Sequence, residues 1–192
     1  MAIVINGSGT VTGLAVGGLP DGTVDSGTLA TDSVTAAKLE ASAITGADLP
    51  AGSVLQVVTA TTTTEVSTTS TSYVALSNLT LSITPSSTSS KIFLVLTVPH
   101  YVGASSSGSH VSSNIFRGSV SGTSLGNSSW GFGSVFVTNS SAIASNVSGN
   151  YLDSPNTASA QTYTTAFRVN GGTGYAMINS QRGTLTAMEI AG

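Results

Sequence analysis

Lys91-Ile-Phe-Leu-Val-Leu-Thr-Val98 is the stretch that decides the fold, because six of its eight residues are apolar and they occur at both odd and even positions. A strand with one solvated face alternates apolar and polar side chains, whereas a strand covered on both faces is apolar throughout. The stretch therefore predicts a central strand that is packed on two sides.

Alternating apolar and polar residues on either side of this stretch predict further strands. Leu79, Leu81 and Ile83 alternate with threonine and serine, which is typical of a half-buried strand. Other strands are expected at residues 163–169, 175–178 and 185–190, with a glycine-rich turn at 171–174, whereas 99–150 is expected to be rich in loops. Many short strands joined by such turns predict an all-β fold, with a β-sandwich (jelly-roll-like) head domain at 53–192.

A different period governs the N-terminal part of the chain. A leucine, valine or isoleucine occurs at every fifth residue, at Leu14, Leu19, Val24, Leu29, Val34, Leu39, Ile44, Leu49 and Val54. A period of five fits one face of neither a helix nor a flat strand, so it indicates a winding backbone that sends one apolar side chain inward per pentad. We therefore expect residues 1–52 to form an extended attachment and shaft segment, with these nine residues as the shaft core.

Burial of the pentad residues needs more than one chain. Ala47-Asp48-Leu49 matches the core of pentapeptide-repeat solenoids, but some forty residues would give only two coils of about twenty residues, too few to bury a core. Three chains wound together could bury it. This favours a homotrimer over a lone solenoid.

The composition excludes several classes of function. Only 7% of residues are charged and the formal net charge is −3, so no basic patch is available for nucleic acid. The chain has no cysteine and no apolar stretch of about twenty residues, which argues against disulfides, thiolate metal sites and membrane insertion. The N-terminus lacks the basic region of a signal peptide.

Catalytic and metal-binding patterns are weak, so we expect no enzyme, no cofactor and no metal. Only Glu65, Asp153 and Glu189 supply carboxylates to the predicted head. Asp153 is expected to cap a turn, and Glu189 to pair with Arg168 or Arg182 across strands. His100 and His110 are expected to be surface or loop residues, because neither has a cysteine or an acidic neighbour.

Recognition has better candidates. Aromatic side chains on loops offer flat apolar faces to sugar rings, and serine and asparagine donors lie nearby in the sequence. The segment 99–150 supplies the candidate receptor surface, which consists of Tyr101, His110, Trp130 and Phe132. The alternative is that Trp130 and Phe132 fill the sandwich core or a trimer interface.

Several segments of the head resemble one family when taken in order. They are Leu49–Val58, Thr69–Tyr73, Ser82–Ile92, Tyr151–Pro155, Gly171–Gly174 and Thr184–Ile190. Together they resemble the head domain of fibre-like proteins from marine bacteriophages, cyanophages especially. The N-terminal segment Asp32–Pro50 is similar to the V-T-x-x-K-L repeats of phage fibre shafts.

The resemblance implies a virion protein, assembled in the host cytoplasm. It implies a homotrimeric tail fibre that is held by a tail or baseplate protein through its N-terminus and contacts a host-surface glycan through its head. Two alternatives remain open. One is a capsid (head) fibre or decoration protein, and the other is a polysaccharide depolymerase, for which 192 residues leave little room.

Overall fold

The computed structural model is all-β and describes two compact units, at residues 1–44 and 45–192. The described residues are 44–103, 108–137 and 141–192, together with 4–5, 11–12, 29, 31, 34, 35 and 39. In the first unit, β1 (Val4–Ile5) pairs antiparallel with β2 (Val11–Thr12). The pentad residues Leu14, Leu19 and Val24 lie outside the described residues.

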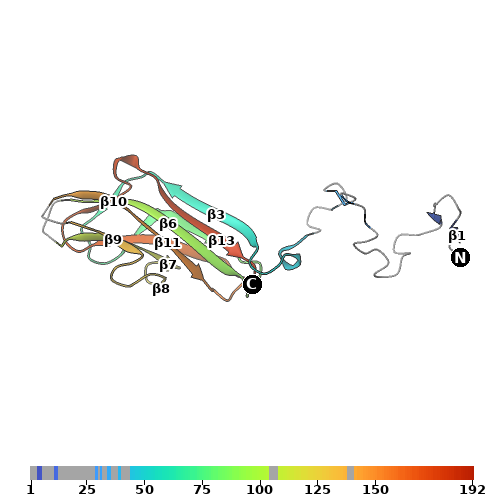
Figure 1. The fold of residues 1–192 in the computed structure, drawn as a ribbon. Coiled ribbons are helices and arrows are strands. Elements are labelled where there is room, and N and C mark those ends of the chain that lie inside the picture. The colour runs from blue at the N-terminus through green and yellow to red at the C-terminus, as the bar shows by residue number, and fades with distance from the viewer. Residues whose placement is uncertain are drawn as a thin grey trace. The chain divides into compact units, whose positions relative to one another are not determined.

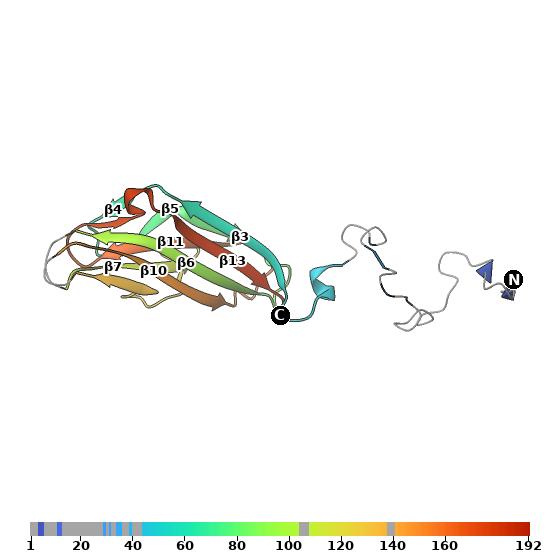
Figure 2. The same ribbon diagram turned by 45° about the horizontal axis from the view of Figure 1, so that its top comes forward.

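The second unit is a sandwich of two antiparallel sheets, labelled in Figure 1. The first sheet has the order β3-β13-β6-β12-β4, and β10 pairs along the other edge of β6. Its strands are β3 (Val54–Thr62), β4 (Val66–Thr68), β6 (Lys91–Val102), β10 (Ile143–Asp153), β12 (Gly174–Ala176) and β13 (Gly183–Ile190). Figure 2 shows β3, β13, β6 and β10 in this sheet.

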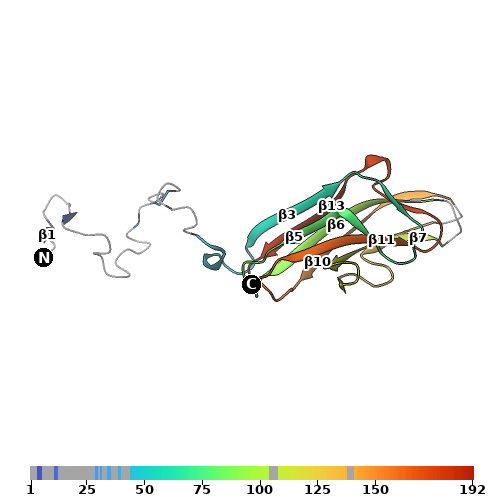
Figure 3. The same ribbon diagram turned by 180° about the vertical axis from the view of Figure 1, so that it is seen from behind.

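The second sheet has the order β5-β11-β7-β8, and β9 also pairs with β7. Its strands are β5 (Val74–Ile83), β7 (His110–Arg117), β8 (Thr123–Ser124), β9 (Gly133–Phe136) and β11 (Gln161–Val169). Figure 3 shows β5, β11 and β7 from behind. Two short 3-10 turns, η2 (Gly46–Asp48) and η3 (Ile178–Ser180), complete the unit.

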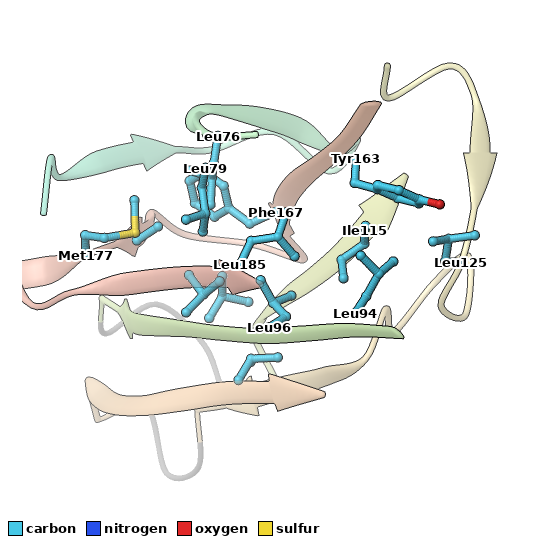
Figure 4. Close-up of a cluster of buried hydrophobic side chains, with 14 of the residues drawn as sticks. Leu76, Leu79, Leu94, Leu96, Ile115, Leu125, Tyr163, Phe167, Met177 and Leu185 are labelled. Carbon is cyan, nitrogen blue, oxygen red and sulfur yellow. The ribbon is translucent and has the colours of Figure 1, made fainter. Parts of the chain in front are cut away.

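The core lies between the two sheets. Leucine and isoleucine side chains from β5, β6, β7 and β13 meet Tyr163 and Phe167 of β11 there, and these two aromatic rings are fully buried (Figure 4). Burial of one such large apolar side chain stabilises the fold by about 1.5–3 kcal/mol. The expected strands at 79–83, 163–169 and 185–190 are confirmed, and all three contribute to this core.

The central strand differs from its prediction on one face. Ile92, Leu94, Leu96 and Val98 of β6 are fully buried, as expected for the core-facing side. On the other face Phe93 is half-buried and Val95 is 36% exposed, so a single chain covers only one side of this strand. The prediction of two-sided packing is wrong for the single chain, because no described part of the head forms a second layer over that face.

The prediction of a loop-rich segment at 99–150 is also wrong. The segment contains all of β7 and most of β10. β7 was missed because Ser112, Ser113 and Asn114 make it polar in sequence, yet all three are fully buried. β10 was missed because most of its side chains are exposed, so it lacks apolar alternation.

Two further predictions need adjustment near the C-terminus. The glycine-rich turn is confirmed, with Gly171 and Gly172 at φ 109° and 70°, and it carries the chain from β11 in one sheet to β12 in the other. The strand expected at 175–178 ends at Ala176. Met177 has φ 54°, which no strand residue adopts, and η3 begins directly after it.

His100 is a core residue rather than a surface residue, because β6 extends to Val102. Its Nδ1 lies 3.0 Å from the Tyr175 carbonyl, and its Nε2 lies 2.6 Å from Ser113 Oγ. A carbonyl oxygen can only accept, so Nδ1 donates to Tyr175 and the neutral ring accepts the Ser113 hydroxyl at Nε2. Burial, opposed in part by the Tyr175 hydrogen bond, lowers the pKa of His100 to about 4.

The stability of the head should therefore fall when the pH is lowered from 6.5 towards 4. In this window the unfolded chain binds a proton that the folded His100 excludes, since its pKa falls from 6.5 to about 4 on folding. The free energy of unfolding should drop by up to about 1.4 kcal/mol per pH unit. Urea denaturation at a series of pH values measures this slope. His100→Gln should flatten it, and parallel curves for the parent and the variant would contradict the assignment.

Candidate functional site

β7 divides its side chains between the core and the outer surface of the second sheet. Val111, Ser113 and Ile115 face the core, whereas His110, Ser112, Asn114 and Phe116 occupy the alternate positions on the outer face. The chain between β7 and β9 folds back over this outer face. The outer row of β7 thus becomes the floor of a surface built by residues 118–136.

Asn114 fixes this overlying segment on the strand. Its Oδ1 accepts the backbone N–H groups of Ile115 and Gly126, both at 2.9 Å, and its Nδ2 donates to Ser124 Oγ at 2.8 Å. The backbone adds a hydrogen bond from Phe132 N to the Ser113 carbonyl at 2.8 Å. A fully buried asparagine is thus satisfied by the loop that it organises.

The turn Asn127–Gly131 presents Trp130 at the top of this segment. Its two end residues exchange backbone hydrogen bonds of 3.1 and 2.8 Å, and Asn127 Oδ1 accepts the N–H groups of Ser129 and Trp130. Gly131 has φ 59°, and a Cβ there would overlap the Ser113 carbonyl. The turn is therefore held on both sides and requires glycine at its end.

Three aromatic rings meet beside this turn, and we call Trp130, Phe136 and His110 the aromatic platform. The ring centroids of His110 and Trp130 are 4.6 Å apart, those of His110 and Phe136 5.0 Å, and those of Trp130 and Phe136 5.6 Å. His110 is buried, whereas Trp130 and Phe136 are 46% and 45% exposed. The buried histidine ring thus supports two exposed aromatic faces.

His110 supports the platform as a neutral ring. Burial lowers its pKa, the Gly108 carbonyl opposes the shift, and the Arg168 charge adds to it. Contrary to its prediction, His110 lies on a strand and is buried, because β9 pairs with β7 at this position through Phe136. A neutral imidazole next to two hydrocarbon rings avoids the cost of a buried charge.

The four predicted receptor residues do not form one surface. The structure brings His110 and Trp130 together and adds Phe136, which the sequence analysis missed because β9 was not predicted. Tyr101 lies in the other sheet, where its ring is 5.6 Å from that of Tyr175. Phe132 packs partly buried against the core and lies 6.3 Å from the Tyr151 ring. The core alternative therefore describes Phe132 and not Trp130.

The carboxylates of the head each have separate structural partners. Glu189 does not pair with Arg168 or Arg182; its Oε1 accepts Ser86 N and Oγ at 2.6 and 2.7 Å, and its Oε2 accepts Gln56 Nε2 at 2.6 Å. The prediction failed because Glu189 faces inward on β13 and is buried. Burial raises its pKa, but these hydrogen bonds outweigh burial and leave the pKa below its usual value.

Asp153 is likewise not a turn cap. It lies buried at the end of β10, where it accepts the Tyr163 hydroxyl at 2.7 Å and forms an ion pair with Arg117 at 3.2 Å. Glu65 accepts Asn179 N at 3.3 Å. In the described part of the chain, no group of three or more His, Cys, Asp or Glu side chains could hold a metal ion. No helix in that part is long and apolar enough to cross a membrane.

No family model and no curated protein matches the chain. Among solved structures, it is similar to the VP2 subviral particle of infectious bursal disease virus, with 13% identity, a TM-score of 0.43 and coverage of 73% of this chain and 34% of that one. It is also similar to the structure of the Gt strain of the same virus, with 11% identity, a TM-score of 0.39 and coverage of 71% of this chain and 38% of that one. The chain thus spans about a third of the capsid proteins it matches. A likeness at this level identifies neither a family nor a function.

The turn that carries Trp130 should depend on Gly131 and not on the tryptophan ring. Gly131→Ala forces a Cβ against the Ser113 carbonyl at a positive φ, so we expect a loss of unfolding free energy of about 2 kcal/mol or more. Trp130→Ala removes a ring that is 46% exposed and should cost about 1 kcal/mol. Chemical denaturation of both variants measures the difference. Equal losses would show that Trp130 is part of the core.

Proposed function

We propose that the chain is a non-enzymatic bacteriophage virion protein, a tail fibre whose head binds a host-surface glycan through the aromatic platform. The observation that carries the proposal is the pair of exposed rings, Trp130 and Phe136, supported from below by His110. Two exposed aromatic rings in contact form an apolar patch rather than a single exposed residue, and a loop on a rigid scaffold is a common setting for binding residues. The resemblance to phage fibre heads supplies the virion context.

The chemistry of the platform fits a saccharide. Sugar rings have apolar C–H faces that stack on aromatic rings, and their hydroxyl groups bond to small polar side chains. Beside the platform, the half-buried Ser134 hydroxyl bonds to the fully buried Ser112 Oγ and contacts the Trp130 carbonyl at 3.4 Å. The rings and the Ser134 hydroxyl therefore offer both kinds of contact.

The non-enzymatic part of the proposal rests on the three head carboxylates. Glycoside hydrolysis by the usual route needs two carboxyl groups that flank one bond. Glu189 is held by Ser86 and Gln56, Asp153 by Tyr163 and Arg117, and both are buried. Glu65, the third, accepts the backbone N–H of Asn179. A saccharide bound at the platform would thus be held and not cleaved.

We also propose that the protein is a homotrimer, with a second copy of the chain covering the outer face of the first sheet. The registers align an apolar row across four strands of this face, which consists of Val57, Met188, Phe93 and Leu152. Val57 is 56% and Leu152 48% exposed. On one side of it, the next two rows contain threonines, Val95, Asn150 and Ser148, and on the other side the next row contains Val54, Ile190 and Lys91.

The pentad residues argue that the occupant of this face is the same chain. Val54, the last pentad position, pairs with Ile190 at the start of β3, is 51% exposed and lies on the side of the sheet that carries Val57. The described pentad residues Leu29, Val34, Leu39, Ile44 and Leu49 are exposed as well. One association of identical chains would cover both the pentad series and the apolar row, whereas an unrelated partner would have to match two separate surfaces.

Removal of the platform rings should weaken binding to host cells. Trp130→Ala or Phe136→Ala deletes one stacking face, for which we expect about a tenfold loss of affinity per binding site. Binding of the fluorescent full-length protein to host cells and to isolated host polysaccharide measures the loss. Tyr101→Ala is the matched control, since it removes an aromatic ring from the other sheet. Unchanged binding by Trp130→Ala would place the receptor surface elsewhere.

Location on the virion distinguishes the tail fibre from the capsid alternative. Antibody against this chain should label the tail in negative-stain images of virions that carry it. Label on the capsid would favour a head fibre or decoration protein.

Shortened polysaccharide chains after incubation with the purified protein would contradict the non-enzymatic assignment.

A charge in the apolar row should dissociate the trimer. Leu152→Lys puts an ammonium group into the proposed interface, where an unpaired charge costs several kcal/mol per subunit. Light scattering should show three times the 19.0 kDa chain mass for the parent and one chain mass for the variant. Val120→Lys is the control, because Val120 is 37% exposed and lies between β7 and β8, away from the apolar row. A monomeric parent protein would contradict the proposal.

A further inference from the structure

A hollow lies beside the aromatic platform on the outer face of the second sheet. It has a volume of about 450 Å³, and its lining includes Tyr73, Phe116, Arg168 and the hydroxyl residues Ser72, Ser121 and Ser128. The rings of Tyr73 and Phe116 meet edge to face at 5.3 Å. We call this hollow the arginine pocket.

Arg168 has no acidic partner in the described part of the chain. Its guanidinium carbon lies 5.5 Å from the centroid of the Tyr73 ring, and its Nη1 donates to the Thr71 carbonyl at 3.2 Å. Its Nε is buried and has no hydrogen-bond partner among the described residues. The guanidinium carries five N–H donors, so a fixed cation with unused donors faces a pocket of hydroxyl groups.

The other charged residues described in the head leave the Arg168 charge without a carboxylate partner. The only ion pair among the described residues joins Arg117 to Asp153, while Glu189 and Glu65 accept hydrogen bonds from uncharged groups. Arg168 stacks on an aromatic ring and has no described carboxylate partner, so it can bind a carboxylate of a ligand. A guanidinium group can donate two parallel hydrogen bonds to one carboxylate.

The arginine pocket and the aromatic platform are neighbours. The turn Asn127–Gly131 places Ser128 in the pocket and Trp130 on the platform. Arg168 pairs with Ser112 across the β7–β11 ladder, two residues from His110 on the same face. Such diagonal positions have Cα atoms about 7–8 Å apart. A ligand on the platform can therefore extend into the pocket without leaving this face.

We propose that the arginine pocket binds the carboxylate of an acidic saccharide whose neighbouring ring stacks on the aromatic platform. This inference rests on the proposed function and names the class of glycan, one that contains uronic or similar acidic sugars. Arg168 pairs with the carboxylate, Tyr73 holds the guanidinium from below, and Ser72, Ser121 and Ser128 bond to the sugar hydroxyls. Neutral saccharides would use the platform alone.

The first test titrates the ¹⁵N-labelled full-length protein with sodium glucuronate at constant ionic strength and follows the arginine Nε–H resonances. The signal assigned to Arg168, by its absence in Arg168→Gln, should shift, while that of Arg182 stays in place. Glucose supplies the ring without the carboxylate, and acetate supplies the carboxylate without the ring. No shift with glucuronate, or an equal shift with acetate, would overturn the assignment to an acidic saccharide.

The second test compares a uronate-containing oligosaccharide with a neutral one of equal length by calorimetry. The parent protein should prefer the acidic one by about tenfold, the value of one charge-assisted hydrogen bond. Arg168→Gln should lose this preference and still bind the neutral one, and Arg168→Lys should keep part of it. Arg182→Gln is the matched control, since it removes an equal charge whose Nη1 contacts Thr61 on the other sheet. An unchanged preference in Arg168→Gln would overturn the inference.

The two tests separate this inference from the proposed function. If Trp130→Ala weakens binding of both saccharides while the parent shows no preference for the acidic one, the glycan-binding function stands and the arginine pocket assignment is wrong. If glucuronate shifts Arg168 but Trp130→Ala binds host cells as well as the parent does, the anion site stands and the platform is not the receptor surface. Melting curves of each variant confirm that the head is folded.

Discussion

The hydrogen bond between His100 Nε2 and Ser113 Oγ, at 2.6 Å, joins the two sheets through the core, and the placement of β7 depends on it. A polar strand pays a desolvation cost when it enters a sandwich, unless each polar side chain finds a partner. Ser113 hydrogen-bonds to His100 on the core side, Asn114 to the backbone of the overlying segment, and Ser112 to Ser134. β7 can therefore be buried on both faces although it carries few apolar residues.

The outer surface follows from this burial. Because Asn114 and the Ser113 carbonyl bond to the chain that follows β7, residues 124–132 lie flat against the strand. Gly131 permits the close approach, and hydrogen bonds within the turn that it ends fix the backbone at Trp130. A binding group whose conformation is fixed before the ligand arrives loses less entropy on binding. The same contacts that satisfy a buried asparagine thus also hold the aromatic platform, the proposed recognition surface, in place.

The sequence predicted the strands that carry a clear apolar pattern. The strands around Leu81, Phe167 and Leu185 were foreseen because their apolar residues repeat at every second position, and the strand around Leu96 because it is apolar at both odd and even positions. β7 and β10 escaped prediction, since one buries polar residues through tertiary hydrogen bonds and the other is mostly exposed. Of the aromatic platform, Trp130 and His110 were among the four candidate receptor residues that the sequence suggested. Phe136 and Arg168 were not, because only the pairing of β7 with β9 and β11 brings them to the same face.

The small number of charged residues shapes the outer faces of both sheets. With so few charged residues, a sheet can expose an uncharged row such as Val57, Met188, Phe93 and Leu152, which a second copy can cover without desolvating ions. Sparse charge also lets a single arginine define the potential of the opposite sheet, where no described carboxylate neutralises Arg168. In the proposed trimer, three copies of the proposed glycan site would act together, and avidity would raise a weak single-site affinity. Self-association through one face would therefore make a modest site on the other face sufficient for adhesion.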